Sequence, residues 1–165
     1  MRLPGLFKLM LTLMFVVIAI HLFERCSAHS ENPEYLPSLA IKIPNDAMKD
    51  TVLVAFIKTN EKKFNLLSHE YESVAQQLTP YLQKQDEDLT FFDRLAVLKL
   101  KADFYAISNR LMEEMEEVDI FFENKQAEGM SDSDFSLYLA IDSAFQQRFN
   151  DLNRKYPSLE KIINQ

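Results

Sequence analysis

Apolar residues recur every three or four positions from Met48 onward, and this is the spacing of one face of a helix. The first series consists of Met48, Val52, Phe56, Leu67, Tyr71, Val74 and Leu78. Asn45 or Asp46 precedes it and is suited to be the N-cap, because a short polar side chain accepts a hydrogen bond from a free N–H of the first turn. Thr79 and Pro80 fit an N-cap followed by a first helical position, so we expect this helix to kink or restart there.

A second helix is predicted after the polar sequence DEDLT, where Thr90 and Asp93 have the spacing of a capping box. Its apolar residues are Phe91, Leu95, Leu98, Ala102, Tyr105, Met112 and Met115. Gly129 is the one glycine from residue 31 onward, and glycine commonly ends helices because it tolerates a positive φ. We therefore expect the second helix to reach Ala127 and to end at Gly129.

A third helix is predicted after Gly129, with Ser131 or Ser133 as its N-cap. Its apolar residues are Phe135, Tyr138, Ile141, Phe145, Phe149 and Leu152. Pro157 should end it, because proline cannot continue a helix from the preceding turn. A short final helix is expected in the sequence SLEKIIN that follows.

Three helices with short connections predict an all-α fold. We expect an elongated antiparallel three-helix bundle over residues 45–165, because helices joined by short loops bury their apolar faces against one another. One alternative concerns residues 39–57, where LAIKI and TVLVAFI are rich in β-formers and flank a PND turn. A lone two-stranded hairpin is marginally stable in water, so the helix is favoured.

Residues 1–30 differ from the rest of the chain and predict an N-terminal hydrophobic leader. Arg2 and Lys8 provide positive charge, and residues 9–23 form an apolar run. Two outcomes remain open: a signal peptide cleaved after Ala28 or Ser30, or a retained membrane anchor in which residues 3–23 span the bilayer. Both outcomes place residues 31–165 outside the cytoplasm, because positive charge precedes the apolar run. If the leader is cleaved, these residues are periplasmic or secreted.

Residues 31–44 are predicted to be an extended tether. Pro33, Pro37 and Pro44 interrupt this stretch, and each proline biases the residue before it toward extended backbone. Cys26 is the chain's one cysteine and lies beside the leader, so the exported part contains no disulfide. It must therefore be stabilised by burial of apolar surface.

Residues 110–134 contain nine carboxylates and, after Arg110, one basic residue. They predict a solvated, partly paired helix face, with a metal site as the alternative. If the first two helices pair through the turn near residue 87, the acidic residues Glu113, Glu114, Glu116 and Glu117 lie level with Lys58, Lys62 and Lys63. By the same register, the basic residues Arg94, Lys99 and Lys101 lie near Glu70 and Glu72.

The sequence offers no pattern typical of catalysis, a cofactor or a metal. His69 is the one histidine outside the leader, and adjacent side chains such as Ser68 and His69 point about 100° apart on a helix. From residue 31 onward there are 15 basic and 24 acidic residues, which disfavours nucleic-acid binding. We therefore expect a protein that is not an enzyme and has no cofactor.

Two pairs of adjacent phenylalanines, at residues 91–92 and 121–122, are too wide to lie wholly on one helix face. Either the buried face is broad, or Phe92, Phe121 and Phe122 contribute to a surface that binds a protein partner. The predicted function is a non-enzymatic extracytoplasmic helical protein-interaction domain, membrane-anchored if the leader is retained.

The alternative function is a periplasmic chaperone-like or apolar-ligand-binding helical bundle. Residues 78–85, LTPYLQKQ, resemble the Leu-Thr-x-x-Gln box of small periplasmic stress chaperones related to Spy. That family consists of exported helical hairpins of basic character. Leu82 stands where the family has Gln, and this chain is acidic, so no family is assigned on this segment.

Overall fold

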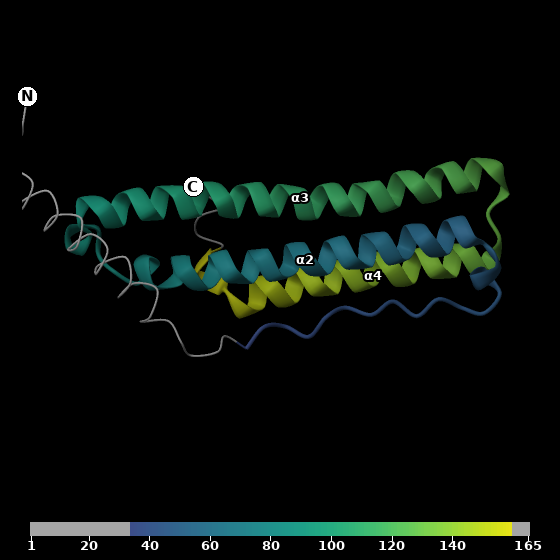
Figure 1. Cartoon of the computed structure of the whole chain (residues 1–165), viewed down its shortest axis with the longest axis horizontal. Coiled ribbons are helices and arrows are strands. Elements are labelled where there is room, and N and C mark those ends of the chain that lie inside the picture. The colour runs from purple at the N-terminus through teal and green to yellow at the C-terminus, as the bar shows by residue number, and fades with distance from the viewer. Residues whose placement is uncertain (1–33, 160–165) are drawn as a thin grey trace, which may run out of the picture. The chain divides into compact units, whose positions relative to one another are not determined.

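The computed structural model describes residues 34–159, and within this range the chain is all-helical, with no strand. It has three long helices, α2 (Thr51–Leu82), α3 (Phe91–Gly129) and α4 (Asp132–Lys155), and three short 3-10 helices, η1 (Ala47–Lys49), η2 (Asp86–Asp88) and η3 (Pro157–Leu159) (Figure 1). The predicted all-α class is confirmed for this range. The hairpin considered for residues 39–57 is wrong, because residues 51–57 belong to α2.

The predicted leader at residues 1–30 lies outside the described residues, as does all of the short helix predicted at residues 158–164 except its first two residues, which belong to η3. From Tyr35 onward the chain forms a compact unit by itself. None of the helices described between residues 34 and 159 is both long enough and apolar enough to cross a membrane.

Helix α2 begins four or five residues later than predicted. Asp50 is its N-cap, and its carboxylate accepts from the N–H of Leu53 at 2.9 Å, whereas Asp46 makes no side-chain cap bond and precedes η1. At the other end the helix continues through Pro80 to Leu82, so the predicted restart is wrong. Continuation is possible because the packing of a long apolar face outweighs one lost backbone hydrogen bond.

The boundaries of α3 are those predicted from the sequence. Thr90 and Asp93 form the capping box: the Thr90 hydroxyl accepts from the Asp93 N–H at 3.2 Å, and Asp93 accepts from the Thr90 N–H at 3.1 Å. Gly129 ends the helix with φ of 104°, a conformation that costs little only for glycine. Ser131 then caps α4 by accepting from the Asp134 N–H at 3.1 Å, and α4 ends before Pro157.

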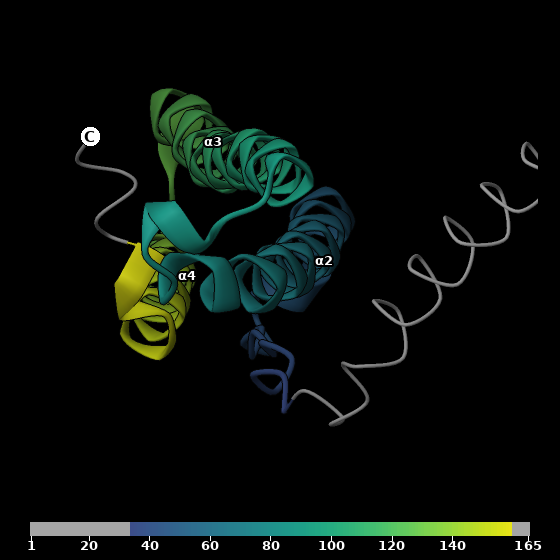
Figure 2. The ribbon, with the colours of Figure 1, turned by 90° about the vertical axis from the view of Figure 1, so that its left-hand side faces the viewer.

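Helix α2 packs against both α3 and α4, as two views of the ribbon show (Figures 1 and 2). Phe56 of α2 stacks on Phe121 of α3, with 3.8 Å between ring centroids, and Phe64 of α2 stacks on Phe145 of α4 at 3.9 Å. The core between the three helices includes Leu53, Ile57, Phe64, Leu67, Tyr71, Leu78, Phe104, Leu111, Val118, Phe122, Leu137, Ile141, Phe145 and Leu152. Burial of these faces supplies most of the stability that a domain without disulfides requires.

Candidate functional site

An extended segment before η1, residues 35–43, lies along α2, and we call it the strap (Figures 1 and 2). Asn65 binds the middle of the strap: its Oδ1 accepts from the Leu39 N–H at 2.7 Å and its Nδ2 donates to the Leu39 carbonyl at 2.9 Å. One helical turn earlier in α2, Glu61 accepts from the Ile41 N–H at 2.7 Å. The strap backbone is therefore bonded to side chains of a helix.

The spacing of these bonds explains how an extended chain can follow a helix. Along α2, Glu61 and Glu72 are 11 residues apart, and their strap partners Ile41 and Leu36 are five residues apart in the opposite direction. Eleven helical residues rise about 16 Å, and five extended residues also cover about 16 Å. The two segments are thus matched in length, and the strap runs antiparallel to α2.

Glu72 forms the end of this row and is almost completely buried, with 1% of its surface exposed. Its carboxylate accepts from the Leu36 N–H at 2.8 Å, from the Lys155 ammonium at 2.5 Å and from the Tyr156 hydroxyl at 3.3 Å. Gln76 donates to the same tyrosine hydroxyl at 3.1 Å. A buried carboxylate requires such partners, because leaving a buried charge unpaired costs about 3 to 5 kcal/mol.

This environment shifts the pKa values of the two C-terminal partners of Glu72. Burial lowers the pKa of Lys155, but the hydrogen bond and charge of Glu72 outweigh burial, so the net pKa is raised. Burial raises the pKa of Tyr156, because the neutral phenol is favoured away from water. Both groups therefore remain protonated to higher pH in the folded chain than in the unfolded chain.

Arg148 of α4 is buried on the other side of the strap and donates to the Pro37 carbonyl. Burial lowers the pKa of its guanidinium. Between strap and helices lies a cavity of about 40 Å³ lined by Leu36, Ser38, Asn65, Ser68, His69, Glu72 and Arg148. A polar cavity of this size has room for bound water but is well below the roughly 300 Å³ of a small-molecule site.

His69 contributes a ring surface to this site. Its imidazole stacks on the Tyr35 ring of the strap, with 4.0 Å between centroids. The neighbouring Ser68 hydroxyl donates to the Phe64 carbonyl at 2.7 Å. The structure therefore gives these adjacent residues different partners, in keeping with their divergence on the helix.

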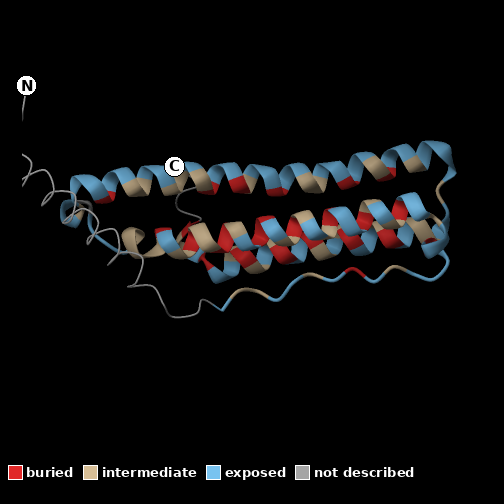
Figure 3. Ribbon diagram, in the orientation of Figure 1, coloured by how far each residue is buried: buried red, intermediate tan, exposed pale blue. Residues whose placement is uncertain are grey.

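A second surface feature lies on α3, which is exposed along much of its length (Figure 3) and carries a row of exposed apolar side chains. We call this row the exposed stripe, and it consists of Phe91, Leu95, Leu98, Tyr105 and Met112. Its spacing of four, three, seven and seven residues is that of a coiled-coil seam. A separate apolar row on α3, Phe104, Ile107, Leu111, Val118 and Phe122, is buried in the core. Helix α3 is thus apolar on two sides.

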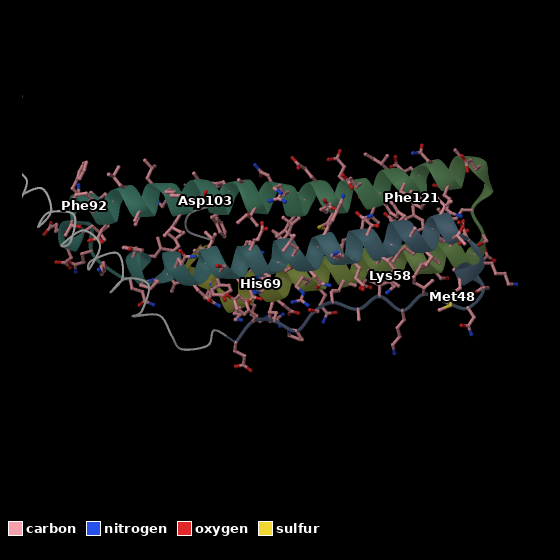
Figure 4. All side chains as sticks on the ribbon, viewed as in Figure 1. Met48, Lys58, His69, Phe92, Asp103 and Phe121 are labelled. Atoms are coloured by element: carbon pink, nitrogen blue, oxygen red, sulfur yellow. The ribbon has the colours of Figure 1, made fainter. Side chains whose placement is uncertain are left out.

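The structure separates the three phenylalanines predicted to form a partner surface. Phe92 is exposed near the start of α3, whereas Phe121 lies toward the other end on the side facing α2, where it stacks on Phe56 (Figure 4). Phe122 is buried, with 2% of its surface exposed. Of the three, Phe92 is exposed, Phe121 is half-buried and Phe122 is buried, so Phe92, beside the exposed stripe, is the most open to solvent.

The prediction that Lys63 lies beside the acidic run of α3 is confirmed. Lys63 pairs with Glu114 at 3.3 Å and with Glu117 at 3.0 Å. Lys58 instead pairs with Glu61 of its own helix at 3.2 Å. Among residues 34–159, no group of three or more His, Cys, Asp or Glu side chains is placed to hold a metal ion.

The other predicted charge pairs differ from those observed. Glu70 pairs with Arg110 at 3.3 Å, and Lys99 pairs with Asp103 of its own helix at 2.8 Å. Glu72 pairs with Lys155 of α4, so Glu70, Glu72 and Lys99 each have an ion-pair partner other than the predicted ones. Pairing the first two helices through the turn near residue 87 predicts which residues lie at the same level along them. It does not predict which side of its helix each residue faces, or that α4 supplies a partner.

A lysine joins the ends of three helices at the opposite end of α2. Lys125 of α3 pairs with Asp50, the N-cap of α2, at 2.8 Å and with Asp134 in the first turn of α4 at 3.3 Å. Hydrogen bonds to these two carboxylates raise the pKa of Lys125 against the effect of burial. The hydrogen bond from Leu53 and then that from Lys125 lower the pKa of Asp50.

Comparison of the chain with protein-family models, with curated proteins and with solved structures finds no match in any of the three. Its function must therefore be argued from its own residues.

Proposed function

We propose that this chain is a non-enzymatic, extracytoplasmic protein-interaction domain in which residues 45–165 form an elongated antiparallel three-helix bundle. In this proposal the leader directs export, and residues 3–23 hold the domain at the membrane if the leader is retained. The exposed stripe of α3 binds the protein partner. Phe92 is retained from the predicted surface, whereas the half-buried Phe121 and the buried Phe122 are assigned to the packing between helices.

The exposed stripe is the observation that supports this proposal. Phe91, Leu98 and Met112 each leave more than half of their surface in water, at 70%, 67% and 53%. From Phe91 to Met112 the stripe extends for about 32 Å. A row of exposed apolar side chains on one helix is a feature of interaction sites, and its seven-residue repeat fits the apolar face of a partner helix.

The test is site-specific photocrosslinking with the full-length protein in the membranes of cells that produce it. A photoreactive residue at Leu98 should capture a discrete partner, whereas one at Gln147, an exposed polar position of α4, should not. The substitution Leu95→Glu should abolish the Leu98 crosslink, because it places a charge in the apolar contact. Equal crosslinking from both positions, or a crosslink that survives Leu95→Glu, would contradict the assignment of the stripe.

Export is tested separately with a reporter fused after residue 165. The reporter should be active only outside the cytoplasm. Resistance of the membrane-bound protein to carbonate extraction, with an intact N-terminal mass, identifies a retained anchor. A mature N-terminus near residue 29 or 31 identifies cleavage, and cytoplasmic reporter activity would contradict export altogether.

A further inference from the structure

We propose that the strap covers a binding site for an extended polypeptide segment, and that this site accepts such a segment from a partner when the strap is released. The site consists of Glu61, Asn65, Ser68 and His69 with Glu72 of α2, together with Arg148 of α4. It is distinct from the exposed stripe of α3 and does not depend on that assignment.

The polar groups of the site bind atoms that every polypeptide carries. Asn65 bonds the N–H and carbonyl of Leu39, Glu61 bonds the N–H of Ile41, and Arg148 bonds a carbonyl of the strap. Recognition through the backbone gives affinity for extended chains in general, as in peptide sites where a segment is added to a sheet edge. The side chains of the bound segment that pack between the helices determine specificity.

The strap shows which side chains the site selects. Leu36, Leu39 and Ile43 are partly buried against the core and Ile41 is buried, while Tyr35 stacks on His69. The occupant is therefore an extended segment with an aromatic residue followed by apolar residues at the first, fourth, sixth and eighth positions after it. Such a segment occurs in a partner protein, and the strap is its counterpart within this chain.

The site is organised largely by residues outside the strap. Besides its bond to Leu36, Glu72 is bonded to Lys155 and Tyr156, so two of these three contacts to its carboxylate come from outside the strap. A binding group held in its bound position loses less entropy when a ligand arrives. The vacated carboxylate and amide groups then favour another extended chain, because polar groups that are shielded and unbonded carry a free-energy cost.

The strap also leaves space that another segment can use. The cavity of about 40 Å³ beside Ser38 is lined by the polar side chains of Asn65, His69 and Arg148. A segment with Asn in the position of Ser38 places an amide there and adds bonds that the strap lacks. The strap is connected to α2 through residues 44–50, which include η1 with the buried Ala47, so rotation before η1 would release the strap without altering α2, α3 or α4.

The experiment uses the full chain with a weakened strap. In the variant Leu39→Asp/Ile41→Asp the strap no longer competes, because each new carboxylate replaces an apolar contact and adds negative charge near Glu61. The probe is a fluorescent peptide of residues 34–43, and binding is followed by anisotropy. A shuffled peptide of the same composition and the unmodified full chain are the controls.

We expect the peptide to bind the double variant at least tenfold more tightly than it binds the unmodified chain, whose own strap competes. Adding Asn65→Ala should weaken this binding at least fivefold, while adding Asn109→Ala, at an exposed position of α3, should leave it unchanged. A peptide with Asn in place of Ser38 should bind more tightly than the original. If the double variant keeps its helical circular dichroism but binds no peptide, or binds the shuffled peptide equally, the proposal is overturned.

A second format covers the case in which the double variant does not fold. A protease site is inserted between Asn45 and Asp46, the chain is folded, and the connection is then cut. Labelled peptide in excess should replace the severed strap within a day, and failure to exchange overturns the proposal. A native dimer that Asn65→Ala dissociates would also overturn it, because the occupant would then be the strap of a second copy.

Discussion

Asn65 bonds both main-chain polar groups of Leu39, accepting from its N–H at 2.7 Å and donating to its carbonyl at 2.9 Å. One amide side chain on a helix thereby does for Leu39 what a neighbouring strand does in a sheet. The strap has no strand partner within residues 34–159, so this side chain satisfies backbone groups that would otherwise require water.

The first prediction concerns this contact. Asn65→Ala should lower the free energy of unfolding by about 1 to 3 kcal/mol, because two hydrogen bonds of about 0.5 to 1.5 kcal/mol each are lost. Urea denaturation measures the difference. Proteolysis of the folded chain should become faster within residues 35–43.

Asn109→Ala is the matched control, because it makes the same substitution in the middle of an exposed helix face and includes the same gain in helix propensity. It should leave stability unchanged or slightly higher. Equal effects of the two substitutions would show that the Asn65 bonds contribute nothing net.

The second prediction concerns Lys155. Lys155→Met should destabilise the chain at pH 7 by about 2 to 3 kcal/mol, because Glu72 then remains buried without its nearest cation. Lys62→Met, at an exposed position of α2, should change stability by less than about 0.5 kcal/mol. Denaturation of the three proteins in urea provides the comparison.

The raised pKa values of Lys155 and Tyr156 also predict a loss of stability at alkaline pH. A group whose pKa is raised by folding stabilises the folded chain fully below its unfolded pKa, which is about 10 for tyrosine and about 10.4 for lysine. This contribution disappears as the pH rises through the higher folded pKa. The Lys155→Met variant should therefore lose less stability than the unmodified chain as the pH rises from about 9.5 to about 11.5, a range that surrounds these pKa values. An unchanged alkaline slope would argue against this assignment.

The third prediction concerns the lysine that joins three helix ends. Lys125→Met should cost about 1 kcal/mol or more, because Lys125 pairs with two carboxylates and has only 22% of its side chain exposed. Lys99→Met should cost less than about 0.5 kcal/mol, since that side chain is 77% exposed. Thermal and urea unfolding should rank the two in this order.

Asp50→Asn tests the same cluster at acid pH. The pKa of Asp50 is lowered in the folded chain, so its contribution is present above the unfolded pKa of about 3.9 and is lost as the pH falls through the folded value. Asparagine is also a good N-cap, so the substitution removes the charge and keeps the cap. The stability of the variant should fall less steeply below pH 4 than that of the unmodified chain, and an unchanged slope would contradict this role of Asp50.

The fourth prediction concerns the acidic run of α3. Neutralising Glu113, Glu114, Glu116 and Glu117 to Gln should change stability by about 1 kcal/mol or less, because exposed ion pairs contribute about 0 to 1 kcal/mol each and relief of net negative charge opposes their loss. Calcium, manganese or iron at micromolar concentration should not raise the melting temperature of the unmodified chain. A rise of several degrees that the fourfold variant lacks would identify a metal site, because a ligand of the folded state stabilises it by mass action.

Local signals made much of the helical structure predictable. The capping box of Thr90 and Asp93, the positive φ of Gly129 and the cap at Ser131 depend on residues a few positions apart, so the sequence contains them directly. The start of α2 was misplaced because several polar residues before Thr51 are acceptable N-caps, and the choice of Asp50 depends on the three-helix contact through Lys125.

The strap site could not be predicted in the same way. Glu72 lies in the sequence HEYES, which has the composition of an exposed helix face, and its burial depends on Lys155 and Tyr156 more than 80 residues later. Bonds from side chains to an extended backbone leave no periodic pattern, so residues 31–44 indicated only a tether. The exposed stripe was visible as a pattern, but its spacing could not show which side of α3 would face the core.

The contact between Arg148 and the Pro37 carbonyl joins residues 111 positions apart. Synthesis proceeds from the N-terminus, so the strap and α2 are complete long before α4 exists. A growing chain, or one cut short before Arg148, lacks Lys155 and Tyr156. Its Glu72 carboxylate is therefore bonded to water instead. The strap therefore makes all of these contacts only after α4 and Tyr156 have been synthesised, and products cut short before Arg148 should be more open to proteolysis at residues 35–43.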